Sequence, residues 1–251
     1  TRLLPYLVKN GVDPLSIEGI ADTLYRVPSF HVDYVMQEVG VPVGFWRAVG
    51  NSQNAFFMES FIDELAATAN VDPVGFRRRM LAGKPRHLAL IERLVRESRW
   101  GKAPAGRVQG IALHESYGSI VGMVVEASVN GKAVTIHQVT CVVDCGTVIN
   151  PDTVAAQVES SVAYGLTAAW FGEIHVKEGS VVEGNFDTYP MLRLAQMPPV
   201  QTFIMDNEEA PGGMGEPALP PIAPALANAI FAATGNRHRS LPLSKHGLGP
   251  A

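Results

Sequence analysis

Residues 108–144 constrain the fold more than any other stretch, because apolar and polar residues alternate there over long runs. Alternation with a period of two predicts β-strands at Val108–Glu115, Ile120–Val129 and Ala133–Asp144. The pair Asn130-Gly131 is the strongest short hairpin signal in the chain and joins the last two runs. These residues predict an antiparallel meander against which the other elements pack.

A helix is predicted at Gln53–Ala69, after a loop that closes at Gly50. Ser52 is placed to cap its first turn, because a serine hydroxyl accepts a hydrogen bond from the unpaired amides there. One side of this helix is expected to be apolar and buried, and its residues are Phe57, Phe61, Ile62, Leu65 and Ala66. The acidic residues have spacings that suit a solvated face, and they are Glu59, Asp63 and Glu64.

Further helices are marked by capping residues. Asp72-Pro73 opens a short helix and Asn150-Pro151 opens a long one, since Asp and Asn cap and proline fits the first turn. Small residues along the long helix permit close approach of another backbone or of a ligand. The arginines at 77–79 are interpreted as a solvent-exposed helix face. The predicted helix ranges are 72–83, 86–100, 150–171 and 220–235.

The remaining regular segments are predicted strands, at Phe30–Val39 and Val200–Met205, and a hairpin at Glu173–Glu183 that turns at Gly179. Helices interleaved with antiparallel strands favour an α+β fold with antiparallel or mixed sheets over a doubly wound parallel sheet. We predict two subdomains, residues 1–105 with mixed strand and helix, and residues 106–251 with the sheet and long helices.

Charge and hydropathy exclude two classes of function. A net charge of −4 without a basic run gives no electrostatic footprint for nucleic acid. No apolar run approaches the roughly 18 to 20 residues that a membrane span requires. Cys141 and Cys145 lie on one predicted strand, about 13 Å apart when extended, so they are predicted to be free thiols that pack in the core. The sequence does not decide between a cytoplasmic and a periplasmic location.

The stretch Ala210–Pro221 is the least ordinary loop in the chain. It presents one carboxylate, Glu216, between a glycine cluster and Pro217, so that a bare and then stiffened backbone holds the acid before a helix. The bare amides of the glycines could accept an anionic group. On this local pattern alone, such a segment is more often a connector than a catalytic loop.

Common catalytic templates are missing from the sequence: it has no P-loop, no nucleophile elbow, no His-Glu-x-x-His and no Rossmann glycine motif. Three unusual stretches remain, and they are Phe45-Trp-Arg-Ala-Val-Gly50, Asp144-Cys-Gly-Thr-Val-Ile-Asn-Pro with Gln157-Val-Glu159, and Gly212-Gly-Met-Gly-Glu216-Pro. In this order and at these separations they resemble the molybdenum-binding subunit of the xanthine dehydrogenase and aldehyde oxidoreductase family. The residues of these stretches are most similar to the isoquinoline 1-oxidoreductase beta-subunit branch of that family. The likeness runs from about Val39 to Leu243.

The resemblance implies a fold like that of molybdopterin-binding domains and assigns roles to single residues. Glu216 matches the base that takes a proton while water supplies the oxygen of the product. Trp46, Arg47 and Val49 match residues that shape the substrate pocket. The cofactor contacts implied are Gln157, Gly213, Met214 and Gly215. Ser160 stands where the family's Gln-Val-Glu-Gly signature has glycine, which puts close backbone approach there in doubt.

The resemblance also implies a molybdenum-pterin cofactor, in its cytosine dinucleotide form, with no metal ligand from the protein's side chains. Implied partners are a [2Fe-2S] subunit, an upstream part of the same subunit and a small-molecule substrate, either an N-heterocycle or an aldehyde. The family's Gly-Gly-Gly-Phe-Gly and Gly-Gln-Gly loops have no match here. The chain is therefore expected to be the C-terminal part of a longer subunit, inactive by itself.

Two rival interpretations stay open. The chain could be a scaffold domain or assembly partner that keeps the fold without cofactor or activity. It could also be a small-molecule binding protein that uses a cleft between its helices and its sheet.

Overall fold

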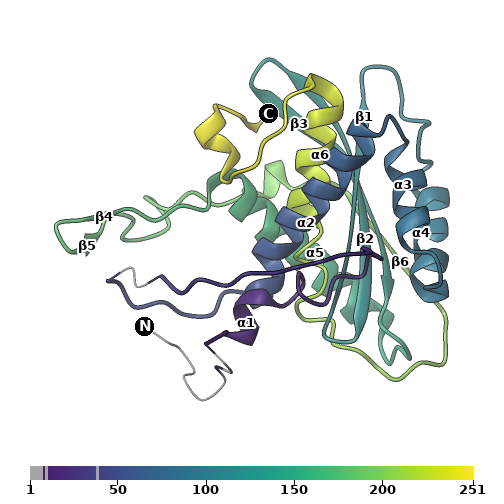
Figure 1. Cartoon of the computed structure of the whole chain (residues 1–251). Helices are drawn as coiled ribbons and strands as arrows, with labels where there is room; N and C mark the ends of the chain where they lie inside the picture. Colours follow the sequence, from purple (N-terminus) through teal and green to yellow (C-terminus); the bar gives the residue numbers. More distant parts are fainter. Residues whose placement is uncertain (1–7, 9–10, 38–39) are drawn as a thin grey trace.

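The computed structural model describes residues 8, 11–37 and 40–251, and its centre is a mixed β-sheet (Figure 1). Strands β1 (Val108–Ser116), β2 (Ser119–Asn130) and β3 (Ala133–Asp144) form the predicted antiparallel meander. Strand β6 (Val200–Ile204) pairs in parallel with β3, so the strand order is β1-β2-β3-β6. The short β7 (Gly249–Pro250) pairs with the start of β3. The predicted α+β class is confirmed.

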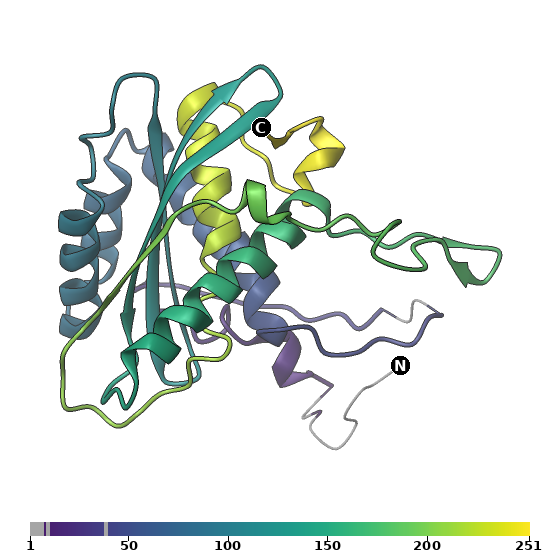
Figure 2. The same ribbon diagram turned by 180° about the vertical axis from the view of Figure 1, so that it is seen from behind.

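The helices of the described residues are α1 (Pro14–Ile17), α2 (Val49–Thr68), α3 (Pro73–Met80), α4 (Pro85–Glu97), α5 (Pro151–Phe171) and α6 (Ile222–Thr234). Short 3-10 helices lie at η2 (Leu194–Gln196) and η3 (Leu243–His246). Helices α3 and α4 lie on one side of the sheet, and α5 and α6 on the other, as the two opposite views show (Figures 1 and 2). Helix α2 runs beside the edge strand β1 and contacts α6 and α3.

Apolar side chains pack on both faces of the sheet. Trp170 of α5 and Ile230 of α6 belong to the cluster on one face, and Leu90 and Leu94 of α4 to the cluster on the other. The backbones of α6 and β1 are in direct contact at Gly110. A Cβ added to this glycine would stand 2.1 Å from the amide nitrogen of Ala229. This close contact brings the start of α6, and the glycine loop before it, against the sheet.

Most predicted caps are confirmed. Asn150 accepts a hydrogen bond from the amide of Thr153 (3.1 Å), and Asp72 accepts one from the amide of Gly75 (2.7 Å). Helix α2, however, begins at Val49, and Ser52 lies within its first turn and donates to the carbonyl of Val49. The predicted cap at Ser52 is therefore wrong. Helix α6 begins at Ile222, so the prolines at 220 and 221 precede its first turn.

The orientation of α2 also differs from the prediction. Ile62 and Ala66 are buried as expected, but Phe57 and Phe61 face solvent. Glu59 and Asp63, predicted to be solvated, are buried against Arg77. The prediction that the arginines at 77–79 are exposed to solvent is therefore wrong for Arg77. The reason is pairing: side chains of opposite charge from α2 and α3 neutralise one another in the interior, which a single-helix pattern does not reveal.

Two segments extend from the same side of the body (Figure 1). One is the hairpin of β4 (Val176–Lys177) and β5 (Ser180–Val181), which confirms the predicted hairpin in shorter form. The other precedes α2, where residues 30–37 form no strand, so that prediction is wrong there; residues 38 and 39 lie outside the described residues. No ladder partner reaches this extended segment among the described strands.

The remaining predictions about the chain have different outcomes. Cys141 and Cys145 are both free and buried, as predicted for core residues. Within the described ranges, no helix combines the length and apolar character needed to cross a membrane. The division into subdomains at residue 105 stays a prediction.

Candidate functional site

The side chain of Arg47 joins all three unusual sequence stretches. Its Nη2 donates to Oε1 of Gln157 (3.0 Å) and its Nε donates to the carbonyl of Gly215 (2.8 Å). Its Nη1 donates to Oγ of Ser160 (2.9 Å), so Ser160 completes the contact instead of obstructing it. The guanidinium of Arg47 therefore contacts segments that lie 110 to 168 residues farther along the chain.

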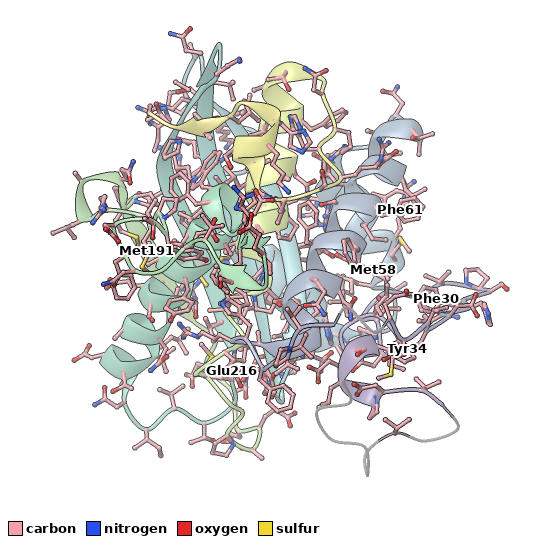
Figure 3. All side chains as sticks on the ribbon, turned by 90° about the vertical axis from the view of Figure 1, so that its left-hand side faces the viewer. Phe30, Tyr34, Met58, Phe61, Met191 and Glu216 are labelled. Atoms are coloured by element: carbon pink, nitrogen blue, oxygen red, sulfur yellow. The ribbon has the colours of Figure 1, made fainter. Side chains whose placement is uncertain are left out.

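Glu216 lies beside this arginine, near the start of α2 (Figure 3). Its Oε1 accepts a hydrogen bond from the amide of Ala48 (2.9 Å), the residue that precedes the helix. The first amides of a helix have no partner within it and carry partial positive charge, so they stabilise a carboxylate. The acid was expected at the mouth of the following helix, but it is α2 that holds it.

The backbone that meets Glu216 is strained. Ala48 has φ 71° and Val49 has φ 48°, values in the left-handed region that a β-branched residue such as valine rarely adopts. Strain of this kind persists only where surrounding contacts enforce it, and it concentrates at functional sites. Here the hydrogen bonds of Arg47 and Glu216 hold the segment from both sides.

A second carboxylate shares the start of α2. Oε1 of Glu18 accepts from the amide of Gly50 (2.9 Å). Burial raises the pKa of Glu18, although the amides of Gly50 and Asn51 lower it, and the charge of Glu216 raises it further. Burial also raises the pKa of Tyr117, with added effects of the charges of Glu18 and Glu216. The charge of Glu216 is therefore close enough to disfavour the charged form of Glu18.

Aromatic rings lie next to the arginine. Trp46 and Tyr164 have ring centroids 6.1 Å apart, and Cζ of Arg47 lies 5.7 Å from the centroid of Tyr164. Burial lowers the pKa of Arg47, while the charge of Glu216 opposes that shift. The guanidinium therefore stays charged between a ring and a carboxylate.

The glycine loop is fixed by its own backbone. The amide of Gly212 donates to the carbonyl of Cys145 (2.9 Å), and that of Gly213 donates to the carbonyl of Tyr117 (2.8 Å). Their amides are occupied, so the expected anion cradle is wrong for these two glycines. Gly146 packs against this loop and has φ +67°. A side chain would not fit at this position, because a Cβ would stand 2.2 Å from the carbonyl oxygen of Ala210.

Residues next to Arg47 and Glu216 in the sequence line two cavities. One, of about 370 Å³, lies between the start of α5 and the glycine loop, and its lining includes Asn150, Gln157, Met214 and Gly215. The other, of about 270 Å³, is lined by Trp46 and Val49 together with Asp13, Leu15 and Ser16.

Comparison with known proteins identifies the family of the chain. Residues 13–81 and 96–198 each match a family described as molybdopterin cofactor-binding domain. The chain belongs to the molybdenum-binding subunits of the xanthine dehydrogenase and aldehyde oxidoreductase family. The glycine loop at 212–216 lies beyond both matched ranges, so its position beside Arg47 comes from the structure alone.

Individual relatives agree with this family assignment. The chain is 34% identical to isoquinoline 1-oxidoreductase subunit beta of Brevundimonas diminuta, over 87% of this chain and 29% of the relative. It is 30% identical to membrane-bound aldehyde dehydrogenase [pyrroloquinoline-quinone] of Gluconacetobacter polyoxogenes, over 92% of this chain and 33% of that protein. The chain therefore spans about a third or less of the length of these relatives.

A solved structure shares the fold. The aldehyde oxidoreductase from Desulfovibrio desulfuricans ATCC 27774 superposes with a TM-score of 0.61 at 13% identity, over 79% of this chain and 40% of that one. At that identity the likeness establishes the fold alone.

The residues around the first cavity fit one side of a molybdopterin. The pterin edge carries both donors and acceptors, and the lining supplies amide groups at Asn150 and Gln157 and hydroxyls at Thr147 and Thr153. A Cβ on Gly215 would meet nothing within 4 Å, so the loop leaves open space there. The cavity is also within the usual size range of ligand sites, about 300–1,000 Å³.

The structure brings together Arg47, Gln157, Gly215 and Glu216, and it places Trp46, Val49 and Met214 in the cavity walls. Gly213 lies in the same loop, but its amide is occupied. Sequence reasoning missed Tyr164 and Glu18. Gln157, Ser160 and Tyr164 follow helical spacing (i, i+3, i+7), so their shared face could have been read from the sequence. Glu18 carries no such signal.

Proposed function

We propose that this chain forms the part of a molybdenum hydroxylase subunit that holds one side of the molybdenum-pterin cofactor and presents Glu216 as the catalytic base. The observation that supports it most is the position of Glu216. Only Oε1 is hydrogen-bonded among the described residues, which leaves Oε2 to accept a proton. The substrate class proposed is an electron-poor N-heterocycle or an aldehyde.

Each residue has a distinct task in this proposal. When bound, the cofactor supplies two-electron oxidation with water as the source of oxygen. The amide of Ala48 orients the carboxylate of Glu216, which is the group that takes the proton in this proposal. Arg47 fixes the carbonyl of Gly215 and so aims the glycine loop. Gln157 accepts from Arg47 through Oε1, so its Nε2 remains to donate to the pterin.

The complete enzyme in this proposal requires polypeptide beyond these 251 residues and a [2Fe-2S] subunit that removes the electrons. The cytosine dinucleotide form of the cofactor belongs to the same proposal. By itself this chain is proposed to be inactive.

One observation favours a second candidate, a scaffold without catalysis. The bond from Ala48 to Glu216 satisfies an unpaired amide at the start of α2. A helix cap of this kind explains the position of the Glu216 side chain without a catalytic role. The two candidates differ in what a neutral isostere at position 216 would do.

Glu216→Gln in the complete subunit, assembled with its iron–sulfur partner, distinguishes them. Glutamine keeps an oxygen that accepts from Ala48 but cannot take the proton, so turnover is expected to fall by about 10²- to 10⁴-fold. Thermal stability and molybdenum content are expected to match those of the wild type. Glu208→Gln is the matched control, because Glu208 is exposed in the segment leading to the same loop. Equal turnover in the Glu216→Gln variant and the wild type would support the scaffold.

A further inference from the structure

The outer side of α2 carries aromatic side chains that the described structure leaves uncovered. Phe57 and Phe61 are 53% and 55% exposed, whereas Glu59 and Asp63 on the inner side are 1% and 4% exposed. Phe57 and Phe61 are four residues apart, so they form a row on one helix face. Figure 3 shows Phe61 on α2, away from Glu216. A surface helix normally has the opposite arrangement, with its charges outside.

A groove borders this row. An apolar cavity of about 440 Å³ lies between α2, α5 and the segment before α6, with Trp46, Phe56, Ala168 and Leu219 in its walls. A smaller hollow of about 190 Å³ surrounds Phe61. Phe56, Phe57 and Arg239 line both, so the two hollows are neighbours. An apolar surface of this kind marks an interaction site.

The rim of the groove is charged. Nε of Arg239 donates to Oε2 of Glu64 (3.1 Å), and both side chains are at least partly exposed. An apolar centre with a polar rim is the usual anatomy of an interface between polypeptides. A surface made for a small polar ligand would instead place polar groups in the floor of the hollow.

The identity of the occupant follows from the relatives. This chain covers only 29% and 33% of the two relatives described above, so most of their polypeptide lies outside the matched stretch. We propose that the groove along Phe57 and Phe61 is the docking surface for an apolar segment of the same subunit, from outside these 251 residues. Covalent linkage gives such a segment an effective concentration in the millimolar range, so a groove of this size suffices.

This proposal rests on family membership and on the exposed face of α2. It does not depend on the catalytic role of Glu216, which lies near the other end of the groove-forming helix. Loss of activity in Glu216→Gln and the contacts of Phe57 therefore give independent results.

The test places a photoreactive phenylalanine, p-benzoylphenylalanine, at position 57 or 61 of the complete subunit. This side chain keeps the aromatic ring, so the fold is preserved. After irradiation, mass spectrometry is expected to find cross-links within the same polypeptide to residues outside this 251-residue stretch. The same probe at position 79, an exposed arginine of α3, is expected to give no such cross-link.

Three results would overturn the proposal: cross-links only to a second copy of the subunit, cross-links only to lipid, or unreacted probe at both positions. A second measurement covers the energetics. Changing both residues to serine in the complete subunit is expected to lower the thermal midpoint by several degrees, whereas Phe57→Leu leaves it nearly unchanged. Equal midpoints for the serine and leucine variants would show that the groove is solvated, and the proposal would fail.

Discussion

Helix α2 connects two charged clusters that differ in their surroundings. At its start, Arg47 and Glu216 are half-buried, and their sequence neighbours Trp46 and Gly215 line two cavities. About three turns further along, Glu59 and Asp63 are buried against Arg77. Both clusters combine carboxylates with a guanidinium group, yet only the first adjoins space for a ligand.

The buried cluster is organised to hold elements together. Arg77 donates to Oε2 of Glu59 through Nε and Nη2, and the same oxygen accepts from the amide of Leu113 in β1. Arg237, after α6, donates to Asp63. Burial by itself would lower the pKa of Arg77, but the charges of Glu59 and Asp63 raise it above its ordinary value. Four elements therefore meet at charges that neutralise one another.

The open cluster distributes its contacts differently. Arg47 donates to two side chains and one carbonyl, and Glu216 accepts from one backbone amide. The comparison teaches that the surroundings of a charged pair, more than its composition, separate a structural role from a functional one. Changes in the first cluster should alter chemistry with little effect on stability, and changes in the second should do the reverse.

The largest effect is expected from Arg77→Met. Removing this guanidinium leaves Glu59 buried without a counter-charge, while Asp63 keeps only Arg237, and this is expected to reduce the free energy of unfolding by about 3–5 kcal/mol. Arg78→Met is the matched control, because Arg78 pairs with Glu92 at the surface and should change stability by no more than about 1 kcal/mol. Urea denaturation measures both. Similar losses in the two variants would contradict the contrast between buried and exposed pairs.

The next effect concerns pH. His114 of β1 donates from Nε2 to Asn51 in the first turn of α2 (2.8 Å), and burial lowers its pKa to about 4. At pH values between about 4 and 6.5, the unfolded chain binds a proton on His114 more tightly than the folded chain does. Stability is therefore present above about pH 6.5 and is lost as pH falls toward 4, by about 3 kcal/mol in all.

The pH prediction is checked by unfolding wild type and His114→Gln across that range. The variant lacks the titrating group, so its stability should fall less steeply with decreasing pH. An identical slope in both proteins would assign the pH dependence to other groups. In that case the hydrogen bond between His114 of β1 and Asn51 of α2 would not contribute to the pH dependence.

The smallest effect is expected from Val49→Gly at the open cluster. Left-handed backbone is unfavourable for a residue with a Cβ by about 1–2 kcal/mol, and glycine removes that strain at an entropic cost of about 0.5–1 kcal/mol. The net expectation is a stabilisation of up to about 1 kcal/mol. Val49→Ala keeps a Cβ, so it should give no such gain. If both variants lost the same stability, the strain at Val49 would be unimportant.

Local patterns predicted much of the fold. Alternating residues at 108–144 gave the meander, and the caps at Asp72 and Asn150 marked two helix starts. The ordered motifs around Arg47, Gln157 and Glu216 singled out three stretches that the structure brings together. These features depend on residues near one another in sequence, or on a family signature that already encodes the fold.

Contacts between distant elements could not be predicted in this way. The faces of α2 were assigned wrongly because Arg77 and Arg237 lie on other elements and draw Glu59 and Asp63 inward. The parallel pairing of β6 with β3, and the capping of α2 by Glu216, also join residues far apart in the chain.

The sequence by itself determined the strands of the meander, most helix starts and the family. Tertiary structure decided which helix end Glu216 caps, which charges are buried and which aromatic face stays open. The physical reason is that the free energy of a charge or an apolar ring depends on what surrounds it, and those surroundings come from segments that only the folded chain brings together.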